Sequence, residues 1–412
     1  MAEALDTLLD FTRPEFRRDP VPTYHRLREI APIARIERGA IRFTVLTRHA
    51  DVVAVLRDPR MSVDRAFQPK PIADDGADPA TLHPLARALR ALSRVMLFRD
   101  PPDHTRLRGL VNKSFTPRMV ESLRPRIQTL VDALLAQPLA DGGFDVVRDL
   151  AEPLPILVIS ELLGLPGADR ADLKRWSDSL AAMLDGSIAM QHIASAIPSA
   201  VALIDYLRVQ LEAKRRAPGD DLLSALLAAQ GQDEHLTDDE ILGTAVIVMG
   251  AGHETTTNLI GNGVLALLRH PGELERLRAQ PALIGTGVDE MLRFDSPVQA
   301  TSRVPVEALE LFGQRFEKGR EIALLLGAAN HDPAVFAEPG RFDLGRRDNR
   351  HVSFGFGIHF CLGAVLARLE GEVALGTLVR RASKLGLATS DDTLAWRQGW
   401  LLRGLTSLPV TL

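Results

Sequence analysis

The chain has 412 residues, 46% of them apolar, a net charge of −4 and one cysteine. One cysteine excludes an intrachain disulfide and any site built from several thiolates, and it favours a reducing compartment. The small negative charge gives no argument for nucleic-acid binding. The N-terminus lacks the apolar stretch of a signal peptide, and the most apolar window, residues 241–252, is too short to span a bilayer. We therefore expect a cytoplasmic protein that binds neither nucleic acid nor membrane.

No linker-like segment divides the chain, so we expect one large domain over residues 1–412. In chain order, periodicity predicts a helix over 19–32, a strand over 42–47 and a helix over 48–59. A Pro-, Asp- and Gly-rich loop should follow from 61 to about 79. The remaining elements are helices over 117–137 and 220–230 and short strands over 320–326 and 405–412. The expected fold class is mainly α with a minor β component.

A long helix is predicted after residue 236. Thr237 and Glu240 have the spacing of a capping box, and the apolar pattern then continues to His270, before Pro271. The helix would have about 33 residues and a length of roughly 50 Å. A helix this long and this apolar should pass through the centre of the molecule.

The single cysteine, Cys361, lies in the stretch FGFGIHFCLG at residues 354–363. It could be a small buried hydrophobic residue, a nucleophile or a metal ligand. The glycines allow tight turns and close approach of a flat ligand. A helix predicted directly after Cys361 would lower the pKa of the thiol and favour the thiolate. A large planar cofactor explains the wall of glycine and phenylalanine, whereas a nucleophile does not.

The spacing Phe354-x-x-Gly357-x-His359-x-Cys361-x-Gly363 resembles the haem-binding signature of the cytochrome P450 family, in its soluble bacterial type. The resemblance implies a single large haem-thiolate monooxygenase fold with a long central helix and a small β region. It also implies that the Cys361 thiolate is the axial ligand of the iron of haem b. Phe354, Gly355 and Gly363 would then shape the loop against the cofactor.

Two further segments are similar to family motifs that hold the haem propionates. His104 and Arg108 look like the H-x-x-x-R pair, four residues apart on one helical face. Arg303 and His359 occupy the places of two more propionate partners, which a buried dianionic cofactor needs. A solvated basic surface remains the alternative for His104 and Arg108.

Glu290 and Arg293 resemble the family's E-x-x-R motif, whose spacing allows an ion pair on one helical turn. Arg341 lies in the segment from which another arginine joins that pair in the family. The resemblance gives these three residues a structural role near the cysteine loop. A surface salt bridge is the alternative for Glu290 and Arg293.

The stretch AGHETT at 251–256 resembles the family's A/G-G-x-D/E-T-T motif on the long helix. It implies that Thr255 donates a hydrogen bond where O2 is activated and that Glu254 relays protons from solvent. Gly250 and Gly252 would leave room for a ligand where the helix bulges. We expect His253 to pack in the core or to support a neighbouring site residue, and not to bind the iron. An ordinary exposed stripe is the alternative.

The resemblance also places an apolar substrate pocket over the haem, for a hydrophobic small molecule that is hydroxylated or epoxidised. The expected lining is the loop within 61–98 and seven other residues: Val248, Ala251, Gly252, Val298, Ala300, Leu401 and Leu402.

Electrons must come from another protein, because the chain has no flavin or nucleotide fingerprint. A ferredoxin and its reductase are the expected partners of a monomer. An acidic partner would be steered by basic residues on the cysteine side: Arg106, Lys113, Arg118, Arg346, Arg347, Arg350 and Arg368. An ordinary solvated surface is equally compatible with these cations. The other functions considered are a peroxide-driven haem oxygenase and a non-catalytic haem sensor, and the Glu254-Thr255 pair disfavours both.

Overall fold

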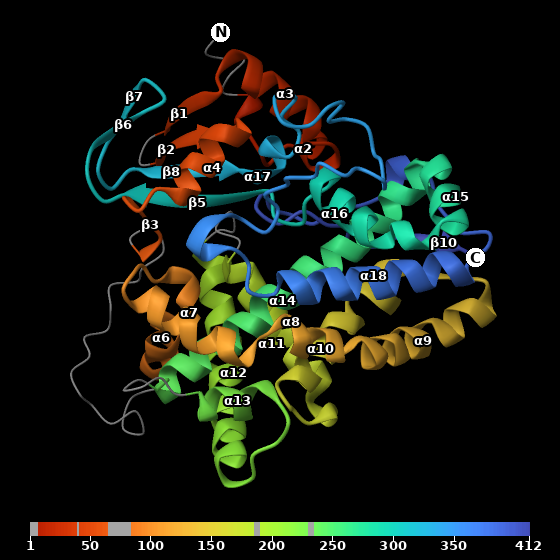
Figure 1. Ribbon diagram of the computed structural model, residues 1–412, viewed down its shortest axis with the longest axis horizontal. Coiled ribbons are helices and arrows are strands. Elements are labelled where there is room, and N and C mark those ends of the chain that lie inside the picture. The colour runs from red at the N-terminus through yellow and green to blue at the C-terminus, as the bar shows by residue number, and fades with distance from the viewer. Residues whose placement is uncertain (1–6, 39–40, 65–83, 185–189, 230–234) are drawn as a thin grey trace. The chain divides into compact units, whose positions relative to one another are not determined.

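The computed structural model describes residues 7–38, 41–64, 84–184, 190–229 and 235–412. These residues are mainly helical and form three small sheets (Figure 1). Their contacts group into two compact units that alternate along the chain. Unit 1 comprises residues 1–62, 124–154 and 255–412, and unit 2 comprises residues 63–123 and 155–254. The expected mainly α class is confirmed, whereas the single domain stays a prediction.

The largest sheet belongs to unit 1 and has the strand order β1-β2-β8-β5-β3. Strands β2 and β8 are parallel, and the other neighbours are antiparallel. Two buried apolar clusters, one around Leu27 and Val45 and one around Val52 and Leu324, pack against this sheet. The strands are β1 Ile33–Arg38, β2 Ile41–Leu46, β3 Met61–Ser62, β5 Ala300–Pro305 and β8 Glu321–Leu325.

The other strands of unit 1 form a three-stranded sheet, β4-β10-β9, and a hairpin, β6-β7. The C-terminal strand lies in the middle of the three-stranded sheet, where Val410 pairs with Phe144 and Leu387. The bounds are β4 Gly143–Asp145, β6 Leu309–Leu311, β7 Gln314–Phe316, β9 Gly386–Leu387 and β10 Pro409–Thr411.

Helix α18 of unit 1 packs against α9 and α16. Gln128 on α9 donates a hydrogen bond to Thr377 on α18 over 3.0 Å. A Cβ atom at Gly371 would lie 3.2–3.3 Å from Leu259 and Val288, so glycine permits close packing here. The helices of this unit are α2 Pro14–Arg18, α3 Val21–Ile30, α4 His49–Arg57, α9 Arg124–Asp141, η3 Val147–Ala151, α15 Pro271–Ala279, η5 Pro281–Leu283, α16 Ile284–Phe294, α17 Leu326–Ala329, η6 Gly357–His359, α18 Ala364–Arg381 and η7 Asp391–Thr393.

Unit 2 is helical in its described residues, and ion pairs join the first turn of α14 to at least three of its helices, α6, α7 and α12. Asp239 pairs with Arg90 on α6 over 2.8 Å, and Glu240 pairs with Arg106 on α7. The elements are α6 Pro84–Ser93, η2 Met96–Phe98, α7 Asp103–Ser114, α8 Pro117–Ser122, η4 Gly167–Asp169, α11 Arg170–Leu184, α12 Met190–Arg216 and α13 Leu222–Ala228. Helices α10 Pro153–Leu162 and α14 Asp238–Arg269 cross the boundary between the units.

Helix α14 confirms the predicted long helix and its capping box. It has 32 residues. The Thr237 N–H donates to Glu240 Oε2 over 2.9 Å, and the Glu240 N–H donates to Thr237 Oγ1 over 3.3 Å. Within the described part of the chain, no helix combines the length and the hydropathy needed to cross a bilayer.

The helix predicted over 117–137 is in fact two helices, α8 and α9, which are separated at Leu123. Pro125 explains the break, because it has no N–H to donate to the carbonyl of Glu121. The strand predicted over 405–412 forms only at Pro409–Thr411.

Candidate functional site

The loop that carries Cys361 depends on glycines with left-handed backbone angles. Gly355 has φ +70° and Gly357 has φ +75°. A Cβ atom at Gly357 would lie 2.7 Å from the Leu56 carbonyl oxygen, so no other residue fits there without a shift. The Cys361 N–H donates to the Phe354 carbonyl over 2.9 Å, which closes the loop.

The Cys361 side chain is exposed and precedes the N-terminus of α18. The helix predicted directly after Cys361 begins at Ala364, and its N-cap residue is Gly363. The N-terminal end of a helix favours a negative charge, and it therefore favours a thiolate at this position.

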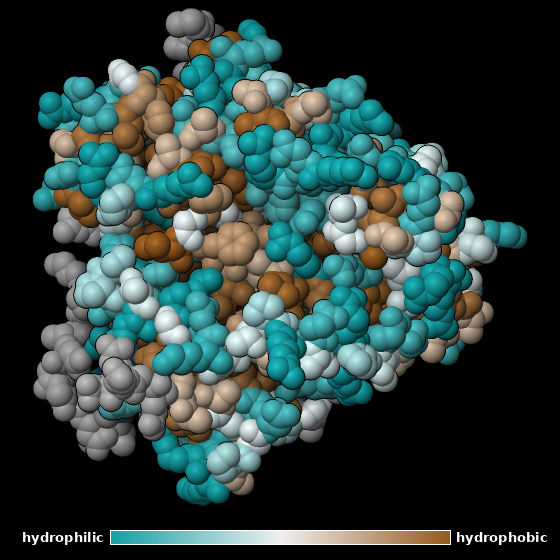
Figure 2. Space-filling view, in the orientation of Figure 1, coloured by the Kyte–Doolittle hydropathy of each residue, from teal (hydrophilic) through white to brown (hydrophobic). Residues whose placement is uncertain are grey.

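Exposed apolar side chains surround the cysteine in the sequence. Ile358 is 52% exposed, Phe360 40% and Val365 39%, which is unusual for large hydrophobic residues. Figure 2 shows hydrophobic side chains at the surface where the loop before α18 lies in Figure 1. An apolar rim around a thiolate suits a large hydrophobic ligand or partner.

Two of the predicted propionate partners lie in unit 1. Arg303 is on β5 and is 5% exposed, and its Nη1 donates to the Ser302 carbonyl over 2.7 Å. His359 ends the short helix η6, two residues before Cys361.

His104 and Arg108, the other two predicted propionate partners, lie in unit 2, four residues apart on α7. His104 is 2% exposed, and burial together with the Arg108 charge lowers the pKa of His104 below its ordinary value. His104 is therefore neutral near pH 7 and can still donate one hydrogen bond. The joint role of these two residues with Arg303 and His359 stays a prediction.

One face of α14 is partly exposed in the middle of a helix that is otherwise buried there. The partly exposed residues recur with helical spacing: Ile247, Val248, Ala251, Gly252, Glu254 and Thr255. Both residues of the predicted acid–alcohol pair are on this face. The next turn is buried, and Thr257 donates its hydroxyl hydrogen to the Ala151 carbonyl over 3.0 Å.

The structure gives a packing explanation for the two glycines of this segment. The helix is regular through Gly250 and Gly252 and does not bulge. A Cβ atom at Gly252 would lie 2.9 Å from Ile159 Cδ1, and one at Gly250 would lie 3.1 Å from Leu180 Cβ. These glycines therefore admit α10 and α11 closely, and their expected role of leaving room for a ligand stays a prediction.

His253 is a packing residue, as expected. It is 2% exposed, its Nδ1 lies 3.4 Å from Ser177 Oγ and 3.6 Å from Asp178 Oδ1, and all three residues belong to unit 2.

The Glu290–Arg293 pair is fully buried and bidentate, with two hydrogen bonds of 2.8 Å. The arginine that joins it is Arg346, whose Nε lies 3.1–3.2 Å from both Glu290 oxygens. The prediction of Arg341 was wrong. The Arg341 side chain pairs with Glu338 at the surface, and only its carbonyl accepts a hydrogen bond from Arg293. Both arginines lie in the same loop, and no local spacing distinguishes them.

The four predicted pocket residues of unit 1 come together at the start of β5. Val298 forms a bridge with Leu402, and the Gln299 N–H donates to the Leu401 carbonyl over 2.8 Å. Ala300 is only 2% exposed, and Leu401 packs against the same apolar cluster. Of the loop predicted within 61–98 as part of the lining, residues 65–83 lie outside the described residues, and most of 84–98 is helical rather than loop, in α6 and η2.

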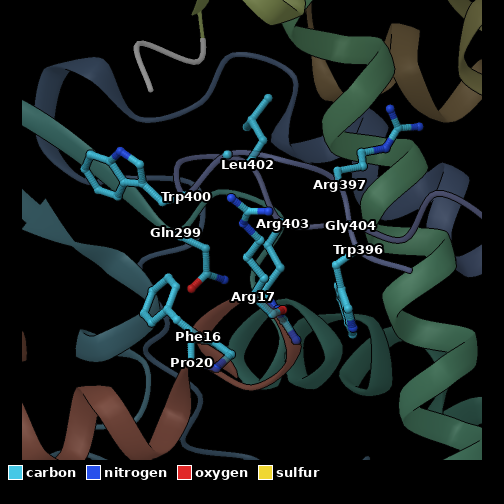
Figure 3. A pocket seen from close by; sticks show the side chains of 11 residues that line it. Phe16, Arg17, Pro20, Gln299, Trp396, Arg397, Trp400, Leu402, Arg403 and Gly404 are labelled. Carbon is cyan, nitrogen blue, oxygen red and sulfur yellow. The ribbon is translucent and has the colours of Figure 1, made fainter. Parts of the chain in front are cut away.

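A small pocket next to these residues holds Arg403 at its centre, between Gln299 and Trp396, while Leu402 points away (Figure 3). Its volume is about 10 Å³, room for roughly one water molecule. It is therefore no substrate site. A second cavity of about 420 Å³ has charged side chains in its wall, among them Arg269, Asp295 and Arg403, beside aromatic ones such as Tyr24.

At least four of the seven basic residues expected to meet a redox partner already pair with carboxylates. Arg106 pairs with Glu240, Arg346 with Glu290, Arg350 with Asp348 and Arg368 with Asp289. The pairing of Arg368 with Asp289 is a feature that sequence reasoning missed, because the two residues are far apart in the chain.

Comparison with known proteins identifies relatives over nearly the whole chain. The Cytochrome P450 family model matches residues 27–280 and 283–384. The chain is 44% identical to a Vitamin D(3) 25-hydroxylase of Pseudonocardia autotrophica, over 96% of this chain and 95% of that protein. It is 37% identical to a 6-deoxyerythronolide B hydroxylase of Saccharopolyspora erythraea, over 99% and 100%. The solved structure of the polyketide synthase cytochrome P450 PksS of Bacillus subtilis 168 matches with a TM-score of 0.88 and 37% identity, over 97% and 98%.

Proposed function

Because the chain belongs to the cytochrome P450 family, we propose that Cys361 holds the iron of haem b and that Glu254 and Thr255 deliver protons beside it. The chain is a monooxygenase, binds haem b and uses O2 and a redox partner to oxidise a hydrophobic substrate.

The observation that carries the proposal is the exposed Cys361 thiol at the N-terminal end of α18, on a loop that requires glycine at 357. The thiolate is the donor that haem iron takes in this family, and the apolar rim of Ile358 and Phe360 suits a porphyrin. Haem bound there supplies the centre at which O2, two electrons and two protons yield water and a hydroxylated substrate.

Glu254 and Thr255 would serve as the acid–alcohol pair of this reaction. Both lie on the partly exposed face of α14, where a carboxylate can take protons from solvent and a hydroxyl can pass them on. His104, Arg108, Arg303 and His359 would neutralise and hydrogen-bond the two propionates, since unpaired carboxylates are costly to bury.

We assign the electron supply to a ferredoxin and its reductase, in the cytoplasm, with the chain acting as a monomer. A single cysteine suits a reducing compartment. The substrate would be bulky and hydrophobic, in keeping with the named substrates of the two hydroxylases above. Val248, Ala251, Val298, Ala300, Leu401 and Leu402 would contact it.

The first test is the absorption spectrum of the reduced protein under carbon monoxide. A strongly red-shifted Soret band in the wild type that is absent in Cys361→Ser supports the thiolate ligand. If the substitution leaves the Soret band unchanged, Cys361 is not the iron ligand.

The proposed role of Thr255 in proton delivery is tested by coupling, which is the fraction of supplied electrons that end in hydroxylated substrate. Thr255→Ala should divert electrons from a ferredoxin system into hydrogen peroxide, whereas Thr255→Ser keeps the hydroxyl and should stay close to wild type. Peroxide-driven turnover should be little changed in Thr255→Ala. Full coupling of that variant would exclude the proposed role of Thr255.

A further inference from the structure

A carboxylate of unit 1, outside the predicted site, lies behind the cysteine loop. Asp289 is on α16, directly before Glu290, and its Oδ1 accepts two hydrogen bonds. Arg368 Nε on α18 donates over 2.7 Å, and His351 Nε2 lies 3.2 Å away. Burial raises the pKa of Asp289, but the hydrogen bonds from His351 and Arg368 outweigh burial and lower it below its ordinary value. Asp289 is therefore ionised near pH 7.

Both partners of Asp289 pack against the first aromatic residue of the loop. The Arg368 guanidinium carbon lies 4.6 Å from the Phe354 ring centroid, and the His351 ring centroid lies 5.8 Å from it. A cation over an aromatic face is attracted to it. The Phe354 carbonyl accepts the Cys361 N–H over 2.9 Å. A continuous series of contacts therefore leads from Asp289 to the cysteine backbone.

We propose that Asp289 is a positioning residue for the thiolate: it holds Arg368 on Phe354, compensates the Arg368 charge behind the loop, and so sets the reduction potential of the haem that Cys361 binds. This inference rests on the proposed role of Cys361. The known motif residues account for neither Asp289 nor Arg368, since Glu290 has its own partners, Arg293 and Arg346.

The sign of the effect follows from the charges. Replacing Asp289 by Asn removes one negative charge and leaves the Arg368 cation uncompensated, which favours the reduced form of the haem and raises its potential. Replacing Arg368 by Gln leaves the Asp289 anion uncompensated and lowers the potential. A mere loosening of the loop would move both variants in the same direction.

The experiment is a spectroelectrochemical titration of the purified holoenzyme and its variants. Asp289→Asn should shift the ferric–ferrous equilibrium toward the reduced form by up to about tenfold, or about 59 mV for one electron. Arg368→Gln should shift it in the opposite direction, and Asp289→Glu, which keeps the charge, should remain near wild type.

The matched control is Asp348→Asn. It removes the same charge three residues before His351, but Asp348 is 69% exposed and pairs only with Arg350 among the contacts described for it. The haem reduction potential of Asp348→Asn should match that of the wild type. The inference is overturned if Asp289→Asn behaves like Asp348→Asn, or if the two cluster variants shift in the same direction.

Two further outcomes remain distinguishable. If Asp289→Asn does not fold, Arg368→Gln against Asp348→Asn decides the inference by the sign of its shift. If the wild type lacks the red-shifted Soret band, the proposed role of Cys361 fails. Unchanged potentials with a normal band overturn only the role of Asp289.

Discussion

The buried Glu290 carboxylate is shared by two arginines, and only one of them is its helical neighbour. Arg346 is 11% exposed and contacts both carboxylate oxygens, whereas Arg341 is 60% exposed and pairs with an exposed Glu338. Charged hydrogen bonds to a buried carboxylate contribute more than a surface ion pair, because removing them leaves a charge without compensation.

We predict that Arg346→Ala lowers the free energy of unfolding of the holoenzyme by about 1.5–3 kcal/mol. Arg341→Ala should lower it by about 0–1 kcal/mol, since its ion pair is solvated. Denaturant unfolding of both variants measures the difference. Equal losses would mean that Arg346 does not support the buried pair.

His331 makes stability sensitive to acid. Burial, followed by the Arg293 charge, lowers its pKa to about 3, and its Nε2 lies 2.9 Å from the Phe294 carbonyl. In the unfolded chain a histidine titrates near pH 6.5. Between these values the unfolded chain binds one more proton than the folded chain. His331 therefore leaves stability intact above about pH 6.5 and lowers it progressively as the pH falls toward 3.

His331→Gln should therefore flatten the pH dependence of stability between pH 6 and 4 by up to about 1.4 kcal/mol per pH unit. Denaturant unfolding at several pH values gives the slope. His235→Gln, at an exposed histidine, serves as the control and should keep the wild-type slope. An unchanged slope in His331→Gln would show that His331 does not stay neutral in the fold.

At the scale of elements, the composition of α14 is explained by the helices packed against it as much as by its partly exposed face. Glycine in a helix costs up to about 1 kcal/mol relative to alanine. Glycine is nevertheless found at 252 because Ile159, which is 2% exposed on α10, lies too close for a Cβ atom: its Cδ1 would be 2.9 Å away. At Gly109 on α7, no described atom outside the helix's own backbone lies within 4 Å of the place that a Cβ atom would take.

Two glycine-to-alanine substitutions should therefore differ in sign. Gly109→Ala should stabilise the protein by about 0.5–1 kcal/mol. Gly252→Ala should destabilise it, because the new methyl group meets a well-packed core side chain. Adding Ile159→Val removes the contacting methyl group and should recover part of the loss. Thermal unfolding measures all three; a gain in Gly252→Ala alone would contradict the packing explanation.

At the scale of the whole molecule, the two units are not consecutive in sequence. The chain passes from one unit to the other at residues 62/63, 123/124, 154/155 and 254/255, and α14 continues through the last boundary. Neither unit is a single stretch of chain that could be excised.

We therefore predict that the described units unfold together, as the single domain expected from the sequence. Scanning calorimetry of the holoenzyme should show a single transition in which both units lose their structure. Two separable transitions would show that the units are independent domains.

Most of what the sequence determined by itself is local. The capping box of α14, the Glu290–Arg293 pair and the glycine loop before α18 each depend on residues within a few positions of one another. Capping, i, i+3 pairing and left-handed turns follow from backbone geometry over such short distances. The family motifs contain these same local arrangements, which is why the fold class and the local geometry of these segments could be predicted, whereas the roles of the site residues stay predictions.

Tertiary structure alone decided which distant residues complete these arrangements. Arg346 joins Glu290 across 56 residues, Arg368 meets Asp289 across 79, and the position of Ile159 explains why residue 252 is glycine. The sequence around Arg341, Arg346 and Arg368 offers several equivalent cations, and local spacing cannot rank them. The packing of α16, α18 and the adjoining loops decides which of these cations reaches a buried or half-buried carboxylate. An uncompensated charge is most destabilising at such a carboxylate, so the cation that reaches it contributes most to stability.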